Sequence, residues 1–301
     1  MNNIKWNEMK NDIFPNLTRP PKDYVPPSNL NKTTNTKNIM GIAYGPTQNW
    51  LNNTPQGLQY QVDNGLTYIR DGLVLDLDAA NSLSYPGTGT TWNNLVNPNS
   101  SFTLTNSPTY NDGYFTFDGV NDYASSTTSN FLKWENWNQL SFTIIFNHIS
   151  ATGQTNNRLY IIDFRTTGTV GTSGALGLFV DNPSTTRELK LFYNTTGNSY
   201  EEPTITTYNF NEWIIYTCTF DKTSSSNNIR HYINGVNVFN RSVTANSTTT
   251  NGDGTIWIGR YSGGNYLFNG KIAYFSAHVN KILTPEEVQL NYNVFKGRYG
   301  L

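Results

Sequence analysis

The 301 residues are rich in aromatic side chains (14%) and poor in charged ones (14%), so the polarity of the chain comes from uncharged Asn, Thr, Ser and Gly. The formal net charge is -1 and no basic run exceeds two residues, which excludes the electrostatic footprint of a protein that binds phosphate backbones. Asn suits turns and Thr suits strands, so the composition predicts an all-β protein with no nucleic-acid partner.

The first residues, MNNIKWNEMKNDIFP, lack the apolar core of a signal peptide. No stretch of the chain approaches the length and apolarity of a transmembrane helix. We therefore expect a chain with no signal peptide, no transmembrane segment and no membrane partner.

Residues 1–71 differ from the rest of the chain. Prolines punctuate a segment rich in Asn, Lys and Thr, without a sustained helical or strand period, so it lacks the apolar surface to fold alone. Two interpretations stay open: a disordered tail, or an extended arm that docks on a neighbouring subunit or on the chain's own second domain. We favour the arm, because large side chains recur along it like anchors. These anchors are Trp6, Phe14, Tyr24, Tyr44 and Trp50.

From residue 72 onward, short strand-like runs follow one another every 8 to 12 residues, separated by turn signals. A hairpin is expected over 229–240, because its Asn234-Gly235 pair suits a type I′ turn. The other main strands are expected at 73–79, 102–105, 114–119, 141–149, 158–164, 175–180, 188–193 and 212–220.

The chain closes with two strands and one helix. A short strand with Trp257 precedes a longer strand over 268–279, and a helix then begins after Thr284. Thr284 as N-cap, Pro285 at the first helical position and Glu287 three residues after the cap form a capping box. The apolar stripe of this helix consists of Val288, Tyr292 and Phe295.

Seven segments occur in a characteristic order: GLVLDLDAANSLSYPGTGTTWNNL, YFTFDGVNDY, SFTIIF, EWIIYTCTFD, HYINGV, IWIGR and FNGKIAYFSAHVNKILTPEEVQLNYNVFKGRYG. Together they make residues 72–301 resemble the concanavalin A-like lectin/glucanase superfamily, specifically the laminin-G-like jelly rolls common in bacteriophage and environmental bacterial proteins. The resemblance implies two antiparallel sheets packed face to face, with the final helix over an edge or open end of the sandwich.

The same fold gives physical roles to residues in its turns. Gly119 and Gly270 are expected where a turn needs positive φ or close backbone approach. Asp118 and Asp122 flank a turn, where carboxylates cap exposed amides. Since some relatives place calcium at a sandwich rim, a calcium site at these two aspartates stays open as an alternative. No other cofactor is expected.

Enzymatic chemistry finds little support in the sequence. The β-glucan hydrolases of this superfamily have an E-x-D-x-x-E or E-x-D-x-E pattern on one strand, and none of the glutamates here lies in such a pattern. His148, His231 and His278 are far apart in expected strands, without the spacing of a zinc site. The single Cys218 lies in a strand-like run and is expected to be a buried, inert thiol. We expect no enzyme.

Aromatic residues in or beside expected loops are the candidates for sugar contacts, because the CH faces of a pyranose pack on aromatic rings. Each of them has an alternative role in fastening a loop to the core. These candidates are Trp92, Trp134, Trp137, Tyr200, Tyr261 and Tyr266.

The resemblance and the missing export signal predict a structural protein of a bacteriophage virion, assembled in the host cytoplasm. In this interpretation the arm binds other virion subunits on a capsid, neck or tail scaffold, in many copies, and the sandwich binds host cell-surface glycans weakly. A purely structural sandwich is nearly as well supported, a bacterial surface carbohydrate-binding or adhesion protein less so, and a glycoside hydrolase least.

Overall fold

The computed structural model describes residues 60–63, 66–126, 132–149, 158–164, 176–181, 183–194, 200–244 and 254–301. The five expected arm anchors lie outside these residues. The chain divides into two units, Met1–Thr67 and Tyr68–Leu301. The larger unit includes Tyr68 and Ile69, whose side chains are buried. Strands β1 (Tyr60–Asp63) and β2 (Leu66–Ile69) form a two-stranded sheet.

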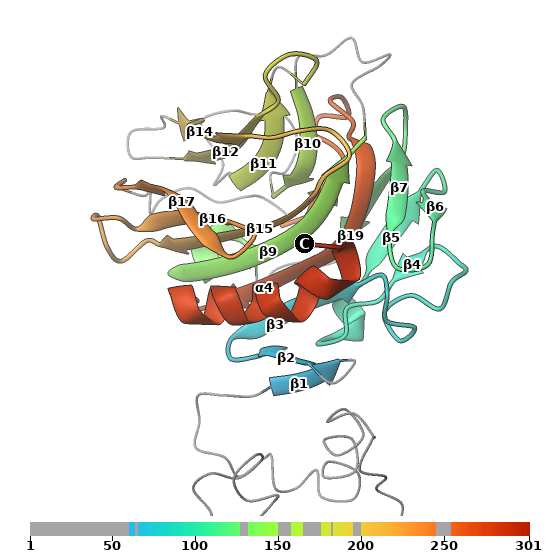
Figure 1. Ribbon diagram of the computed structural model, residues 1–301, viewed down its shortest axis with the longest axis horizontal. Coiled ribbons are helices and arrows are strands. Elements are labelled where there is room, and N and C mark those ends of the chain that lie inside the picture. The colour runs from blue at the N-terminus through green and yellow to red at the C-terminus, as the bar shows by residue number, and fades with distance from the viewer. Residues whose placement is uncertain are drawn as a thin grey trace, which may run out of the picture. The chain divides into compact units, whose positions relative to one another are not determined.

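Two antiparallel sheets build the larger unit, as the sequence predicted (Figure 1). Within the described residues, one sheet has nine strands. In spatial order they are β13 (Tyr200–Glu201), β12 (Glu188–Asn194), β11 (Leu176–Asp181), β10 (Arg158–Asp163), β18 (Trp257–Ile258), β8 (Tyr123–Ser126), β5 (Phe102–Thr105) and β4 (Thr91–Trp92), with β14 (Thr204–Thr207) paired to β12.

The other sheet has eight strands among the described residues. In spatial order they are β17 (Val236–Arg241), β16 (Ile229–Ile233), β15 (Trp213–Asp221), β9 (Gln139–His148), β19 (Asn269–Val279), β7 (Phe115–Asp118) and β6 (Thr109–Tyr110), with β3 (Leu73–Asp78) paired to β19. Strand β19 pairs with β9 along one edge, and with β7 and then β3 along the other. The expected strands are therefore confirmed, and short strands such as β6 and β14 add to them.

The main core lies between the sheets, because alternate residues of each strand point inward. In β9, Leu140, Phe142, Ile144 and Phe146 belong to this core, whereas Ile145 belongs to a separate cluster on the outer face. Both faces of β9 are thus buried, and on the outer face this includes polar residues such as Ser141 and Thr143.

The outer face of the eight-stranded sheet is covered by the helix α4 (Pro285–Tyr299), which crosses it in Figure 1. Val294 and Phe295 pack there against Ile145, Ile215 and Ala273. The expectation that the helix lies over an edge of the sandwich is therefore wrong. An apolar stripe is buried most fully on a broad apolar surface, and the outward residues of the central strands provide one.

The expected caps and turns of the chain are present. Thr284 and Glu287 form the predicted capping box. Asn234 and Gly235 both have positive φ, 50° and 81°, as a type I′ turn requires. Gly119 also has positive φ, whereas Gly270 is required by close approach: a Cβ atom there would lie 2.4 Å from the carbonyl oxygen of Asn147.

The described residues also include the 3-10 helices η1 (Pro98–Ser100) and η3 (Trp134–Asn136). No helix in the described part of the chain is long and apolar enough to span a membrane.

Candidate functional site

The structure separates the six aromatic residues predicted to contact sugar. Trp92 is fully buried against Phe115, with ring centroids 4.9 Å apart, so its ring is part of the core. Trp137 is also buried, and the ammonium group of Lys222 lies 4.0 Å from its ring centroid. Trp134 lies in η3 and Tyr200 in β13, but their side chains are outside the described set. Among the four candidates whose side chains are described, Tyr261 and Tyr266 are the two whose rings lie next to each other.

Tyr261 and Tyr266 lie on the outer face of the nine-stranded sheet, with ring centroids 5.7 Å apart. Both rings also lie close to Tyr160, at 5.2 and 6.2 Å, and Tyr160 stacks on Phe179 at 5.1 Å. Tyr160, Phe179 and Phe192 are buried, whereas Tyr261 and Tyr266 are half-buried. We call these five residues the aromatic patch: a buried aromatic floor with two partly exposed rings above it.

A tight loop between β18 and β19 positions the two exposed rings. The amide of Gly264 donates to the carbonyl of Tyr261 (2.9 Å), which closes the turn. The amide of Tyr160 donates to the carbonyl of Tyr266 (2.9 Å), and the amide of Ser262 to the carboxylate of Asp163 (2.8 Å). Asp163 is fully buried beneath the loop. The loop is thus bonded to β10 at Tyr266 and at Ser262, the residue after Tyr261.

Two glycines make the loop geometry possible. A Cβ atom on Gly263 would lie 2.4 Å from the Tyr261 ring, so this ring folds over a position that only glycine permits. Gly264 has a φ of 95°, which L side chains rarely adopt. The two glycines of the sequence YSGGNY, residues 261–266, therefore allow the tight turn that holds the two tyrosines in place.

Paired charges border the patch on the side of β11 and β12. The Arg158 guanidinium lies 4.9 Å from the Phe179 ring centroid and donates to both oxygens of Glu202 (2.8 and 2.7 Å). The ammonium group of Lys190 bonds to Asp181 (2.8 Å) and lies 3.2 Å from Glu188. These cations are therefore neutralised by acids of the same sheet.

Arg260 borders the patch on the side of β18 and β8. Its guanidinium carbon lies 4.3 Å from the Tyr123 ring centroid and 4.7 Å from that of Trp257, and its Nε donates to the carbonyl of Tyr261 (3.3 Å). Sequence reasoning missed Tyr123, Tyr160 and Arg260 as site residues. For Tyr160 the signal is the strand period: its neighbours Leu159 and Ile161 are in the core between the sheets, so Tyr160 points to the outer face.

The calcium candidates Asp118 and Asp122 form a self-contained turn. One oxygen of Asp118 accepts from the amides of Val120, Asn121 and Asp122 at 2.8 to 3.3 Å, and Asp122 accepts from the Asp118 amide. Burial raises the pKa of the Asp118 carboxyl, but these amide bonds outweigh it and bring the pKa below its usual range. Burial, together with the Asp118 charge, raises the pKa of Asp122 to about 6. The geometry is that of turn caps.

An open cavity of about 410 Å³ lies beside the start of β12 and the end of β14. Its lining residues are Thr185, Thr186, Arg187, Thr207, Tyr208 and Asn209. Arg187 donates to the carbonyls of Tyr208 (2.7 Å) and Thr185 (3.1 Å). The walls are polar and provide no aromatic platform like that of the patch.

The cysteine and the three histidines of the chain lie in strands and are buried. Burial raises the pKa of the Cys218 thiol to about 12, which confirms the expected inert cysteine. Burial lowers the pKa of His231 to about 3 and that of His278 to about 4, so both are neutral near pH 7. No group of three or more His, Cys, Asp or Glu side chains suited to a metal ion occurs in the part of the chain that the structure describes.

The sequence of residues 118–289, more than half of the chain, matches the model of a laminin-G family, described as the concanavalin A-like lectin/glucanases superfamily. No curated protein matches the chain in sequence.

Solved structures share the fold at low sequence identity. The botulinum neurotoxin serotype D binding domain (15% identical, TM-score 0.53) matches over 74% of this chain and 51% of its own. The serotype D ligand-binding domain in complex with N-acetylneuraminic acid matches over the same shares, at 16% identity and a TM-score of 0.55. A Trypanosoma rangeli sialidase, in complex with the inhibitor DANA, matches at 13% identity and a TM-score of 0.57, over 85% of this chain and 38% of the sialidase. The chain thus spans about half the length of the toxin domains.

Proposed function

The chain belongs to the concanavalin A-like lectin/glucanases superfamily, and we propose that it is a non-enzymatic carbohydrate-binding protein whose aromatic patch is the sugar-binding surface. The observation that supports this most directly is the pair of half-buried rings, Tyr261 and Tyr266, held above a buried aromatic floor. A pyranose presents an apolar CH face that packs on such rings, and the fixed loop limits the entropy lost on binding.

A polar group for sugar hydroxyls lies in the same loop. Asn265 stands between the two tyrosines in sequence and is exposed, whereas Ser262 is buried. A surface of this size suits one or two sugar rings, and such contacts are weak singly. Many copies of the chain on one particle would raise the overall avidity.

Binding without hydrolysis is supported by the acids around the patch. Hydrolysis of a glycosidic bond needs two carboxyl groups that are able to act as acid, base or nucleophile. Asp163 accepts from the Ser262 amide, while Glu202 and Asp181 pair with Arg158 and Lys190. The described acids at this surface are thus engaged in structural bonds.

We propose a bacteriophage virion as the setting, with residues 1–71 docked on other virion subunits and the sandwich turned outward. The sequence resemblance and the spacing of Trp6, Phe14, Tyr24, Tyr44 and Trp50 support this arrangement. Host cell-surface glycans would then be the ligands.

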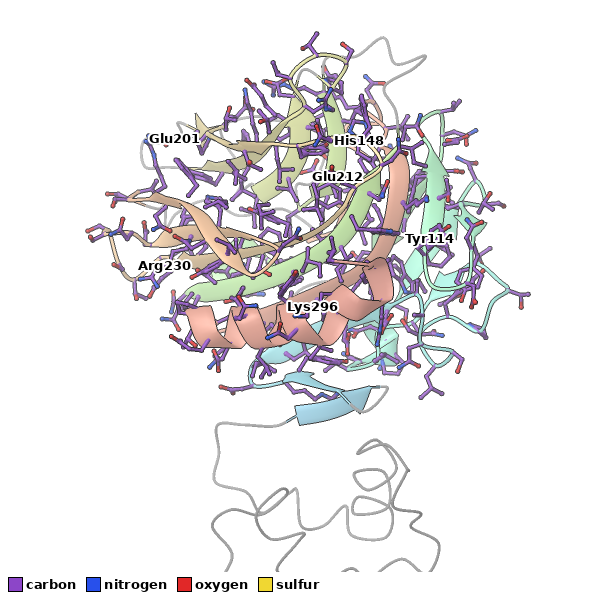
Figure 2. The ribbon with its side chains drawn as sticks, in the orientation of Figure 1. Tyr114, His148, Glu201, Glu212, Arg230 and Lys296 are labelled. Carbon is purple, nitrogen blue, oxygen red and sulfur yellow. The ribbon has the colours of Figure 1, made fainter. Side chains whose placement is uncertain are left out.

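Screening of the full chain against a glycan array tests the binding proposal. We expect binding to a defined set of glycans, and its loss in Tyr261→Ala and Tyr266→Ala. Tyr114→Ala is the matched control, because Tyr114 is equally half-buried but contacts Trp213, on the outer side of the other sheet (Figure 2). A full chain that binds no glycan would contradict the proposal and favour a purely structural role.

Deletion of residues 1–59 tests the arm. This cut leaves Tyr68 and Ile69 in place, so the sandwich should fold with unchanged thermal stability. We expect the shortened chain to be absent from purified particles that contain the full chain. Incorporation at an unchanged copy number would contradict the arm proposal.

A further inference from the structure

Arg260 differs from Arg158 and Lys190, the cations on the other side of the aromatic patch. The guanidinium of Arg158 is engaged by both oxygens of Glu202, with Asp181 3.5 Å away. Arg260 lies against the rings of Tyr123 and Trp257 and forms no ion pair with an acid among the described residues. Among the described residues, no acid therefore neutralises its positive charge at the patch.

The orientation of Arg260 is fixed from three directions. Two aromatic rings contact its guanidinium, and its Nε is bonded to the Tyr261 carbonyl, so its two terminal nitrogens are left as donors. A Cβ atom on Gly264 would lie 3.2 Å from one of these nitrogens, which shows that the guanidinium follows the same turn that positions Tyr261 and Tyr266. Arg260 is half-buried, so its donors remain reachable from solvent.

A guanidinium held in this way matches a carboxylate. Its planar pair of N–H donors fits the two oxygens of a carboxylate in a bidentate arrangement, and stacking on aromatic rings reduces the entropy lost on binding. Because Arg260 and Tyr261 are adjacent in one tight turn, a sugar ring stacked on the tyrosines would place a ring substituent near the guanidinium.

We propose that the aromatic patch binds a carboxylated sugar, a uronic or sialic acid, whose ring stacks on Tyr261 and Tyr266 and whose carboxylate bonds to Arg260. This inference rests on the proposed carbohydrate binding and adds the class of ligand. A sulfated sugar is the competing anionic ligand. The donor pair of a guanidinium fits two oxygens of either group. We favour the carboxylate because in a uronic or sialic acid it is attached directly to the ring, whereas a sulfate is attached through an ester oxygen.

The test compares the affinity of the full chain for matched oligosaccharides at one salt concentration. The probes end in N-acetylneuraminic acid or its neutral methyl ester, in glucuronic acid or glucose, and in 6-sulfated galactose or galactose. We expect the acidic sugars to bind more tightly than the neutral ones. Arg260→Met should lose roughly 10-fold to 100-fold in affinity for the acidic sugars, the range of a charge-assisted bond, and little for the neutral ones.

Two further variants separate a specific role from a structural one. Arg230→Met removes the same charge from β16 of the other sheet, where Arg230 donates its Nε to the Asn227 carbonyl (3.3 Å), and should leave all affinities unchanged (Figure 2). Arg260→Lys keeps the charge without the planar donor pair, so we expect an intermediate affinity for acidic sugars and a stable fold.

The outcomes distinguish the two proposals. Equal binding of acidic and neutral sugars, or an acid preference that survives in Arg260→Met, would overturn the role of Arg260 while carbohydrate binding stands. Preference for the sulfated sugar over both carboxylated ones would overturn the carboxylate assignment. If no oligosaccharide binds, both proposals fail.

Discussion

The outer faces of the two sheets both have buried apolar residues, but different elements of the chain cover them. On the eight-stranded sheet, Ile145 and Ile215 are covered by Phe295 and its neighbours in α4. On the nine-stranded sheet, Tyr160 packs against Tyr261 and Tyr266 of a short loop, and the Arg158 guanidinium lies over Phe179. A long helix closes one face, whereas a short loop leaves partly exposed rings on the other. The proposed sugar-binding surface thus lies on the sheet face where outward aromatic residues meet a short loop.

Removal of the helix contact should have the largest effect. Phe295 is buried between Tyr68 and Tyr274, with ring centroids 5.7 and 4.4 Å away. We expect Phe295→Ala to lower the free energy of unfolding by about 3–5 kcal/mol, measured by chemical denaturation. Lys296→Ala, on the same helix, is the control and should change little (Figure 2). Glycan affinity measured on the folded fraction should be unchanged, and its loss would contradict the separation of the two faces.

The helix-covered sheet should also respond to acid through His231. Burial lowers the pKa of His231 to about 3 in the folded state, below the usual value near 6.5. As the pH falls below about 6.5, the unfolded chain therefore binds a proton at His231 before the folded protein does. The stability contributed by the neutral histidine is complete above that pH and is lost toward pH 3. The expected loss is about 1.4 kcal/mol per pH unit in this window.

His231→Gln isolates this contribution from that of buried carboxyl groups, such as Asp122, which have the opposite sign. We expect the stability difference between wild type and variant to shrink from pH 7 to pH 5. A difference that stays constant over this range, or a His231 imidazole NMR signal that titrates near pH 6.5 in the folded protein, would refute the lowered pKa of His231.

The N-cap of the helix gives a smaller change. The hydroxyl of Thr284 accepts from the Glu287 amide (3.2 Å), and the Glu287 carboxylate accepts from the Thr284 amide (2.8 Å). Thr284→Ala should cost about 1 kcal/mol of stability, read from the denaturation midpoint, without any change in sugar binding. A Ser replacement keeps the hydroxyl and should recover most of the loss.

Gly263→Ala should have the smallest effect on stability and a clear one on binding. The new Cβ atom would displace the Tyr261 ring, but Gly263 is exposed and its φ is not positive, so we expect a stability change below about 1 kcal/mol. Glycan affinity should fall nonetheless, because the ring leaves its place over the patch. Unchanged affinity at unchanged stability would show that the Tyr261 position does not matter.

Local signals in the sequence determined most of the fold. The strand periods, the Asn234-Gly235 turn and the capping box of Thr284 and Glu287 each depend on residues close in sequence, and all three are confirmed. The position of α4 was predicted incorrectly, because the surface it covers is assembled from strands far apart in the chain.

The candidate site likewise combines features that local sequence predicts with features that depend on contacts between distant segments. The sequence proposed Tyr261 and Tyr266 from their loop setting, along with Trp92, which proved to be buried. Whether an aromatic side chain near a loop points inward or outward depends on strand register and on packing between sheets, which only the tertiary structure decides. The meeting of Tyr160 from β10, Arg260 from the β18–β19 loop and Tyr123 from β8 was likewise set by strand pairing between distant segments. Local chemistry thus specified the elements, and long-range pairing decided which of their side chains share a surface.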